Sequence, residues 1–243
     1  VTFIDADDFW EHNFIETALK KMKNNTSCSV FLCGANWIGK NYNDVRLPIY
    51  SFEKNPEEAK WILPENLSAE DLINSMDFFS TGAVVAKRTT LINYGGYFDK
   101  VFCNSGEDGY LWVQVMFNEP IYRCLIPLVN INTMGSDLGI NRKSLKPTPP
   151  ALIYDQLLFK NIKKNRHNDL SSLLNLLAFR SFRLRLYDFQ FFQSFGLLKK
   201  YPNLKKYKAN DYPNIPFAFI SIPINRCIIK PFLFIYRKLI HAK

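Results

Sequence analysis

The chain of 243 residues opens with VTFIDADDFW, residues 1–10, and the fold follows from how this stretch is interpreted. Residues 1–4 are a short apolar, β-branched run that stops at acidic residues, which is typical of a buried parallel strand. Three carboxylates follow within four residues, at Asp5, Asp7 and Asp8. Because ligands of open α/β sheets bind at the carboxyl ends of strands, the pattern predicts a binding site here.

The carboxylates of Asp5, Asp7 and Asp8 repel one another unless a cation joins them. Carboxylate oxygens are the ligands that Mg²⁺ or Mn²⁺ prefers, and phosphate oxygens commonly complete the shell. The residue types therefore predict a divalent-metal site that also holds a phosphate-bearing molecule. A solvated turn, with Asp8 capping the helix that follows, is an equal alternative from the residue types alone.

Outward from this turn, strand-like and helix-like stretches alternate, which indicates an α/β sheet. We expect Gly34 to end a strand, and residues 35–66 to form an irregular surface excursion. The remaining expected elements are strands over residues 29–33, 82–86 and 120–131, and helices over residues 9–23, 68–76 (with a capping box at 68–71), 88–93, 107–117, 152–164, 170–179 and 182–198.

A second acidic pair, Glu107-Asp108, follows Gly106 at the start of an expected helix. In isolation such a pair is ordinarily a favourable partner of the helix dipole. The functional alternative is a general base, which is a carboxylate positioned to take a proton from an attacking hydroxyl.

Four stretches together resemble family 2 glycosyltransferases of the GT-A, or nucleotide-diphospho-sugar transferase, fold. They are FIDADDFW (3–10), STGAVVAKR (80–88), GGYFD (95–99) and EDGYLW (107–112). Their order and spacing are more specific than either acidic motif alone. The resemblance covers residues 1–132 and leaves out the C-terminal third.

The resemblance implies an inverting, metal-dependent hexosyltransferase. It would transfer one sugar from a nucleotide-sugar donor, for which we expect a UDP-sugar, to a glycan or lipid-linked acceptor in surface polysaccharide biosynthesis. Asp5, Asp7 and Asp8 would bind the donor and its Mn²⁺ or Mg²⁺ ion, and which of them touches the metal stays open. Asp108 would be the catalytic base, and Glu107 would position it or bind the acceptor.

For the acceptor, the resemblance implies that Gly95 and Gly96 shape the subsite and that Trp112 could line it. A core aromatic is an equal alternative for Trp112. The Gln-x-x-Arg-Trp signature of processive synthases is absent from the sequence, which favours transfer of a single sugar.

Members of this family carry further strands and a base-reading aspartate before the D-x-D pair, whereas here the pair begins at residue 5. The sequence therefore predicts a partial GT-A domain lacking its first strands in residues 1–147, followed by a basic helical extension in residues 148–243. We expect this chain alone to bind a nucleotide-sugar poorly and to be inactive.

The net charge of +9 favours anionic partners. No nucleic-acid motif is present, so we expect no nucleic-acid partner. Basic residues interleaved with aromatics over residues 179–186, and an apolar tail over residues 212–243, suit a peripheral contact with the inner face of the plasma membrane as well as packing on the catalytic domain. No uncharged run is long enough to span a bilayer.

Five cysteines without a Cys-x-x-Cys pair indicate reduced thiols in the cytoplasm, and no signal peptide is recognisable. Two other function classes stay open. A haloacid-dehalogenase-type phosphotransferase also begins with an apolar strand and Asp-x-Asp, although Phe9-Trp10 fits it badly. A non-catalytic, basic membrane-binding module is supported by charge alone.

Overall fold

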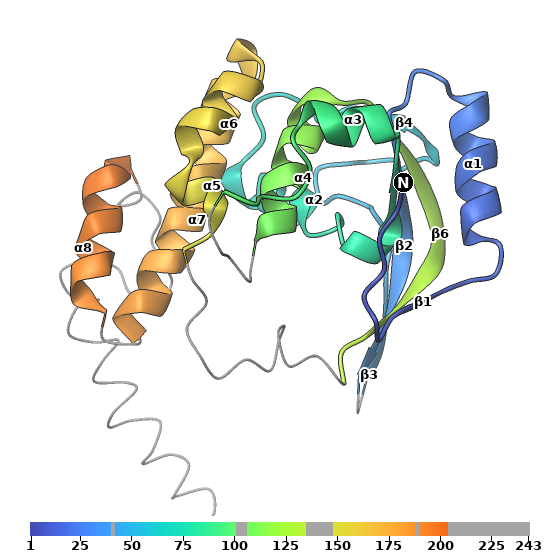
Figure 1. Cartoon of the computed structure of the whole chain (residues 1–243), viewed down its shortest axis with the longest axis horizontal. Coiled ribbons are helices and arrows are strands. Elements are labelled where there is room, and N and C mark those ends of the chain that lie inside the picture. The colour runs from blue at the N-terminus through green and yellow to red at the C-terminus, as the bar shows by residue number, and fades with distance from the viewer. Residues whose placement is uncertain (40–41, 101–105, 135–147, 188–189, 204–243) are drawn as a thin grey trace, which may run out of the picture. The chain divides into compact units, whose positions relative to one another are not determined.

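The computed structural model describes residues 1–39, 42–100, 106–134, 148–187 and 190–203. Within them the chain forms a mixed, open sheet of six strands with helices (Figure 1), so the predicted α/β class is confirmed. The chain divides into two compact units, Val1–Leu173 and Leu174–Lys243, and the whole sheet lies in the first.

Two long strands, β2 (Val30–Gly39) and β6 (Ile121–Asn132), form the centre of the sheet. They run parallel, from Val30 opposite Ile121 to Ile38 opposite Asn132. Four shorter strands pair antiparallel with them: β1 (Phe9–Trp10) and β4 (Ala59–Trp61) with β6, and β3 (Tyr42–Arg46) and β5 (Val84–Ala86) with β2.

Helices cover both faces of the sheet, with α1 (Phe14–Asn24) on one and α2 (Ala69–Met76), α3 (Arg88–Asn93) and α4 (Glu107–Asn118) on the other (Figure 1). On the α1 face, Phe14 and Ala18 pack against Phe31, Cys33 and Tyr122 of the central strands. Helix α4 is buried all round from its second turn onward, as expected of a helix enclosed by other elements. The remaining elements are η1 (Thr81–Ala83), α5 (Pro150–Ile153), α6 (Asp155–Asn161), η2 (Lys164–Arg166), α7 (His167–Tyr187) and α8 (Phe191–Lys200).

Elements with strong local signals match the prediction closely. The capping box is present, because the Ser68 hydroxyl accepts a hydrogen bond from the Asp71 amide at 3.1 Å at the start of α2. Gly95 and Gly96 follow α3 with φ of 81° and 71°, a backbone region that favours glycine. Helices α3 and α4 and strand β6 lie within one or two residues of their expected bounds.

The expectation of a buried parallel strand over residues 1–4 is wrong. Thr2 forms an isolated antiparallel bridge with Val85, and Val1 and Ile4 are 50% and 42% exposed. Because β5 has only three residues and runs the opposite way, it offers this segment a short antiparallel edge and little cover.

The expected end of a strand at Gly34 is also wrong. Strand β2 continues to Gly39, and the register with β6 shifts on both sides of Gly34, as at a β-bulge. A Cβ at Gly34 would lie 2.7 Å from the Leu47 side chain and 3.0 Å from the Arg46 carbonyl oxygen. The glycine therefore permits close approach of a neighbouring segment, and residues 35–66 contain two strands instead of being irregular throughout.

Helix boundaries elsewhere follow tertiary contacts more than hydrophobic spacing. The helix expected over residues 9–23 begins at Phe14, because Trp10 pairs with Val129 of β6 and its Nε1 donates to the Gly82 carbonyl at 2.9 Å. The expected helix over residues 152–164 is divided into α5 and α6, whereas α7 runs unbroken through residues 180–181. Asn161 at the end of α6 donates to Gln114 of α4 at 2.8 Å.

The thiols within the described residues are reduced, as expected: Cys28, Cys33 and Cys124 are free and buried. Burial raises the pKa of Cys124 to about 11 and raises that of Cys33 further. Cys103 and Cys227, like residues 212–243, lie outside the described ranges. Among the helices that the structure describes, none combines the length and apolarity that a membrane span requires.

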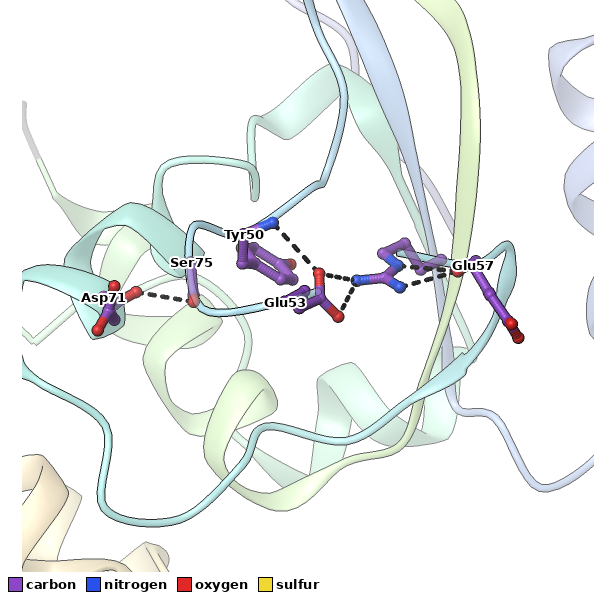
Figure 2. Close-up of polar contacts among 6 residues, drawn as sticks. Tyr50, Glu53, Glu57, Asp71 and Ser75 are labelled. Carbon is purple, nitrogen blue, oxygen red and sulfur yellow. Dashed lines mark hydrogen bonds and ion pairs between the residues drawn. The ribbon is translucent and has the colours of Figure 1, made fainter. Parts of the chain in front are cut away.

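A buried ion pair fixes the segment between β3 and β4 to the sheet. Arg123 of β6 is 4% exposed, and its Nη1 donates to the Glu53 carboxylate at 2.6 Å. Its Nη2 donates to the Glu57 carbonyl at 2.8 Å, and Glu53 also accepts from the Tyr50 amide. Figure 2 shows these residues, with a separate Ser75–Asp71 bond on α2. The Arg123 guanidinium thus joins two points of the segment to β6.

We predict that Arg123→Ala lowers the free energy of unfolding by about 3–5 kcal/mol, because it leaves the Glu53 carboxylate without its partner in a mostly buried position. Urea denaturation measures this. Asp44→Ala is the control, since it removes the exposed pair with Arg46 and should cost less than about 1 kcal/mol. Equal losses for the two variants would contradict the structural role of Arg123.

Candidate functional site

The acidic turn, residues 5–8, closes with the Asp8 amide donating to the Asp5 carbonyl at 3.1 Å. The preceding segment is attached to β5 by two bonds of 2.8 Å between Val1 and Ala86, and by the Thr2 hydroxyl on the Val84 carbonyl at 2.7 Å. The turn therefore projects from the edge of the sheet at a fixed place.

Asp8 connects the acidic turn to the carboxyl end of β6. Its Oδ1 accepts a hydrogen bond from the Asn132 amide at 2.9 Å. Gly82 lies beside it, where a Cβ would be 3.2 Å from Val129 and 3.8 Å from Asp8 Oδ2. Asp8 is half-buried and holds the turn in place, whereas Asp5 and Asp7 are exposed.

The second acidic pair begins α4, as predicted. Gly106 precedes it with φ of 85°, a left-handed conformation that a glycine adopts without strain. The Gly109 amide donates to Asp108 Oδ1 at 2.7 Å, which fixes the carboxylate and leaves its other oxygen for a ligand. The Glu107 carbonyl accepts from the Phe98 amide at 3.1 Å, so the loop after Gly95-Gly96 is attached to the same helical turn.

The fold brings the two acidic motifs together. Although Asp5 is exposed as a residue, the nearby protein partly removes its carboxylate from water, and this desolvation, then the charges of Asp7 and Asp108, raise its pKa. Burial likewise raises the pKa of Asp8, with further contributions from Asp5 and Asp7 and against the effect of its bond to Asn132. Since Asp108 is near enough to influence Asp5, the acidic turn and the first turn of α4 border one site.

Tyr97 lies between the two motifs. Its ring centroid is 4.8 Å from that of Phe3, next to the acidic turn, and 6.2 Å from that of Trp112 on α4. Burial, together with the charges of Asp108, Asp5 and Glu107 and against the effect of the neighbouring Thr81 side chain, raises the pKa of Tyr97 to about 12. Tyr97 was not predicted as a site residue, although it directly follows the Gly95-Gly96 pair. Its place in the GGYFD stretch (95–99), one of the four that carry the resemblance, was the signal in the sequence.

Three buried polar atoms at this site have no hydrogen-bond partner among the described residues: the Tyr97 hydroxyl, Glu107 Oε2 and Trp112 Nε1. Leaving a buried polar group unpaired costs about 1–3 kcal/mol. Glu107 and Trp112 belong to α4, and the Tyr97 ring packs on Trp112, so these three groups gather at the N-terminal half of α4.

The structure places the remaining predicted residues around this centre in different ways. Trp112 is 1% exposed and also packs at 6.0 Å from Phe79, as the core interpretation expects. Gly95 and Gly96 line an open pocket of about 270 Å³, together with Tyr94, Tyr97, Tyr110 and Asn161. Tyr97 therefore belongs both to the lining of this pocket and to the surroundings of the carboxylates.

The metal expectation can be compared with the side chains present. Among the described residues no three His, Cys, Asp or Glu side chains are grouped so as to hold an ion by themselves. Mg²⁺ is ordinarily held by one or two carboxylates with substrate phosphates and water. Asp5 and Asp7 fit that smaller donor set, since both are exposed and Asp8 already accepts a backbone hydrogen bond.

We predict that Mn²⁺ raises the melting temperature by about 5–10 °C at about a hundredfold excess over its Kd. The raised pKa of Asp5 means that the folded chain holds this proton more tightly than the unfolded chain. Ionising Asp5 therefore reduces stability as the pH rises through its folded-state pKa. A bound cation offsets that loss, so the Mn²⁺ effect should be larger at neutral than at acidic pH.

Thermal denaturation of Asp5→Asn/Asp7→Asn should show a higher melting temperature without metal and almost no Mn²⁺ effect. Glu16→Gln, in the first turn of α1, is the control and should respond to Mn²⁺ as the unsubstituted chain does. An undiminished Mn²⁺ effect in the double variant would place the cation elsewhere.

We predict that Tyr97→Phe leaves the free energy of unfolding unchanged or raises it by up to about 1 kcal/mol, because it removes a buried hydroxyl that, although Thr81 is near, makes no hydrogen bond of good geometry with the described residues. Tyr94→Phe is the matched control. Its hydroxyl donates to Glu119 at 2.7 Å, so its loss should cost about 1–2 kcal/mol. Urea denaturation compares the two, and a loss for Tyr97→Phe equal to that for Tyr94→Phe would show that the Tyr97 hydroxyl is satisfied in the folded chain.

Comparison of the chain with protein-family models, with curated proteins and with solved structures found no match.

Proposed function

We propose that this chain is part of an inverting, metal-dependent glycosyltransferase of the family 2 type, built on a partial GT-A domain. One observation carries the proposal: the acidic turn and the first turn of α4, far apart in the sequence, meet around Tyr97. Inverting sugar transfer needs a base for the incoming hydroxyl and a cation at the leaving diphosphate. Of two acidic motifs at one site, one can act as the base and the other can bind the cation.

On the donor side, Asp7 and Asp5 would hold Mn²⁺ or Mg²⁺ together with the diphosphate of a nucleotide-sugar. We propose a UDP-sugar as this donor. When bound, the ion neutralises the negative charge that develops on the departing nucleoside diphosphate. Asp8 keeps the turn against β6 through its bond to Asn132 and contributes to the donor site by position.

On the acceptor side, Asp108 takes the proton of a sugar hydroxyl as that oxygen attacks the anomeric carbon. The bond from this carbon to the diphosphate breaks on the opposite face, so the configuration inverts and the nucleoside diphosphate leaves with the bonding electrons. Glu107, Tyr97 and Trp112 would orient the acceptor through the three buried polar atoms that lack partners among the described residues. Gly95 and Gly96 would shape its entry.

We further propose transfer of a single sugar to a glycan or lipid-linked acceptor of surface polysaccharide, on the cytoplasmic side of the plasma membrane. The buried thiols within the described residues are reduced, which suits that compartment. We also propose that the 243-residue chain binds a donor poorly. The acidic turn stands at the edge of the described sheet, so few described residues would surround a nucleotide there.

We predict that Asp108→Asn lowers the rate of sugar transfer about 10²–10⁴-fold while donor binding changes little, since it removes the base and keeps the shape. The protein to assay includes whatever coding sequence continues upstream of Val1, and release of nucleoside diphosphate from a panel of nucleotide-sugars with Mn²⁺ is the readout. Asp7→Asn should instead weaken donor binding. Glu16→Gln is the control.

Transfer with retention of the anomeric configuration, or unchanged transfer by Asp108→Asn, would refute the assignment. Hydrolysis of an aryl phosphate that is lost in Asp5→Asn would instead support a haloacid-dehalogenase-type phosphotransferase. Strong UDP binding by the 243-residue chain in calorimetry would contradict the partial-domain expectation alone.

A further inference from the structure

Helix α8 of the second unit presents aromatic rings on its outer side. Successive helical residues are about 100° apart, so one side carries Phe191, Phe192, Phe195 and Lys199, and the other carries Ser194 and Leu197. Phe192 is 91% exposed and Phe195 is 56% exposed, whereas Ser194 and Leu197 are 0% and 8% exposed. Ser194 and Leu197 therefore lie on the covered side of the helix, and the aromatic side is exposed.

This arrangement differs from that of ordinary exposed apolar residues, which are scattered singly over protein surfaces. Neighbouring exposed rings on one helix form a contiguous apolar patch, and such patches mark contact sites. Lys199 lies on the same side at the C-terminal end, is exposed, and is followed by Lys200. The outer side of α8 thus combines apolar area with positive charge.

The charge of the chain is divided unevenly between its two units. Residues 174–243 contain thirteen lysines and arginines but only two aspartates and no glutamate. Residues 1–173 contain eighteen basic and twenty acidic residues, so the net charge of +9 comes entirely from the second unit. A basic unit with an exposed aromatic helix is complementary to a surface that is both anionic and apolar beneath its charges.

We propose that α8 lies in the plane of an anionic phospholipid surface, with Phe192 and Phe195 at the boundary between headgroups and acyl chains and Lys199 extended to the lipid phosphates. A ten-residue helix is about 15 Å long, which suits a position in the plane of the membrane interface and is too short to cross a bilayer. The flexible stem of a lysine lets its ammonium reach the headgroups while its methylenes stay near the apolar boundary.

This inference does not depend on the sugar transfer proposed above, because lipid contact needs neither the acidic turn nor α4. The experiment sediments the full chain with vesicles of phosphatidylcholine and phosphatidylglycerol, and with vesicles of phosphatidylcholine alone. We expect binding to the anionic vesicles only, weakened by salt because the attraction of the lysines is screened.

The variants Phe192→Ser and Phe195→Ser should each weaken partition to anionic vesicles roughly tenfold, since each removes an aromatic ring from the apolar phase. Lys199→Ser should weaken it less and reduce its salt dependence. The matched control is Leu19→Ser on α1 of the first unit, also an exposed apolar residue on a helix (58%), which should leave partition unchanged. Circular dichroism checks that each variant is folded.

A second measurement uses Phe192→Trp with lipids brominated along the acyl chain. Quenching beyond that of the unsubstituted chain is expected, because residue 192 should reach the bromines. Three results would overturn the proposal: no binding to anionic vesicles, binding that Phe192→Ser leaves intact, or conversion of a dimer to a monomer by Phe192→Ser in light scattering. The last would identify a second copy of the chain as what covers the patch.

Discussion

The parallel pairing of β2 with β6 is the interaction on which the described fold depends. Every other strand of the sheet bonds to one of these two, and α1 packs its buried side against their shared face. The same pairing positions the site, since the acidic turn is bonded to the end of β6 through Asn132 while its approach runs along β5, a neighbour of β2. Loss of the central register would therefore separate both acidic motifs from each other before any side chain at the site changed.

The site combines carboxylates held in fixed positions with buried polar atoms that lack hydrogen-bond partners among the described residues. Short hydrogen bonds fix the carboxylates of Asp8 and Asp108, one to the end of β6 and one to the first turn of α4. The repulsion between each of them and Asp5 therefore cannot be relieved by movement of Asp8 or Asp108 alone. Close by, three buried polar atoms are without partners in the part of the chain that the structure describes. Both features are unfavourable in the folded chain, and the cation and the acceptor hydroxyl groups of the proposed reaction would relieve them.

The parts of the fold that the sequence predicted well are those with local causes. The Ser68 cap, the Gly95-Gly96 helix end and the acidic first turn of α4 each depend on residues within one or two helical turns. The parts predicted wrongly depend on distant neighbours: Gly34 is explained by Leu47 and Arg46, Trp10 by Gly82 and Val129, and the edge position of residues 1–4 by the direction of β5. The site followed the same rule, since both acidic motifs were visible in the sequence, whereas Tyr97 became identifiable only through the rings and carboxylates that surround it.

The buried thiols give the sheet a chemical reporter. Cys33 lies beneath α1 on β2, is 2% exposed, and has a strongly raised pKa, so a thiol-alkylating reagent meets neither an accessible sulfur nor a thiolate in the closed chain. Modification then proceeds only through molecules in which α1 and the sheet have transiently parted, and its rate measures how often that opening occurs. A ligand that binds only the molecules in which α1 and the sheet are in contact lowers the rate of Cys33 modification in proportion to its occupancy, whether or not the ligand reacts. Candidate ligands can therefore be screened without a catalytic assay.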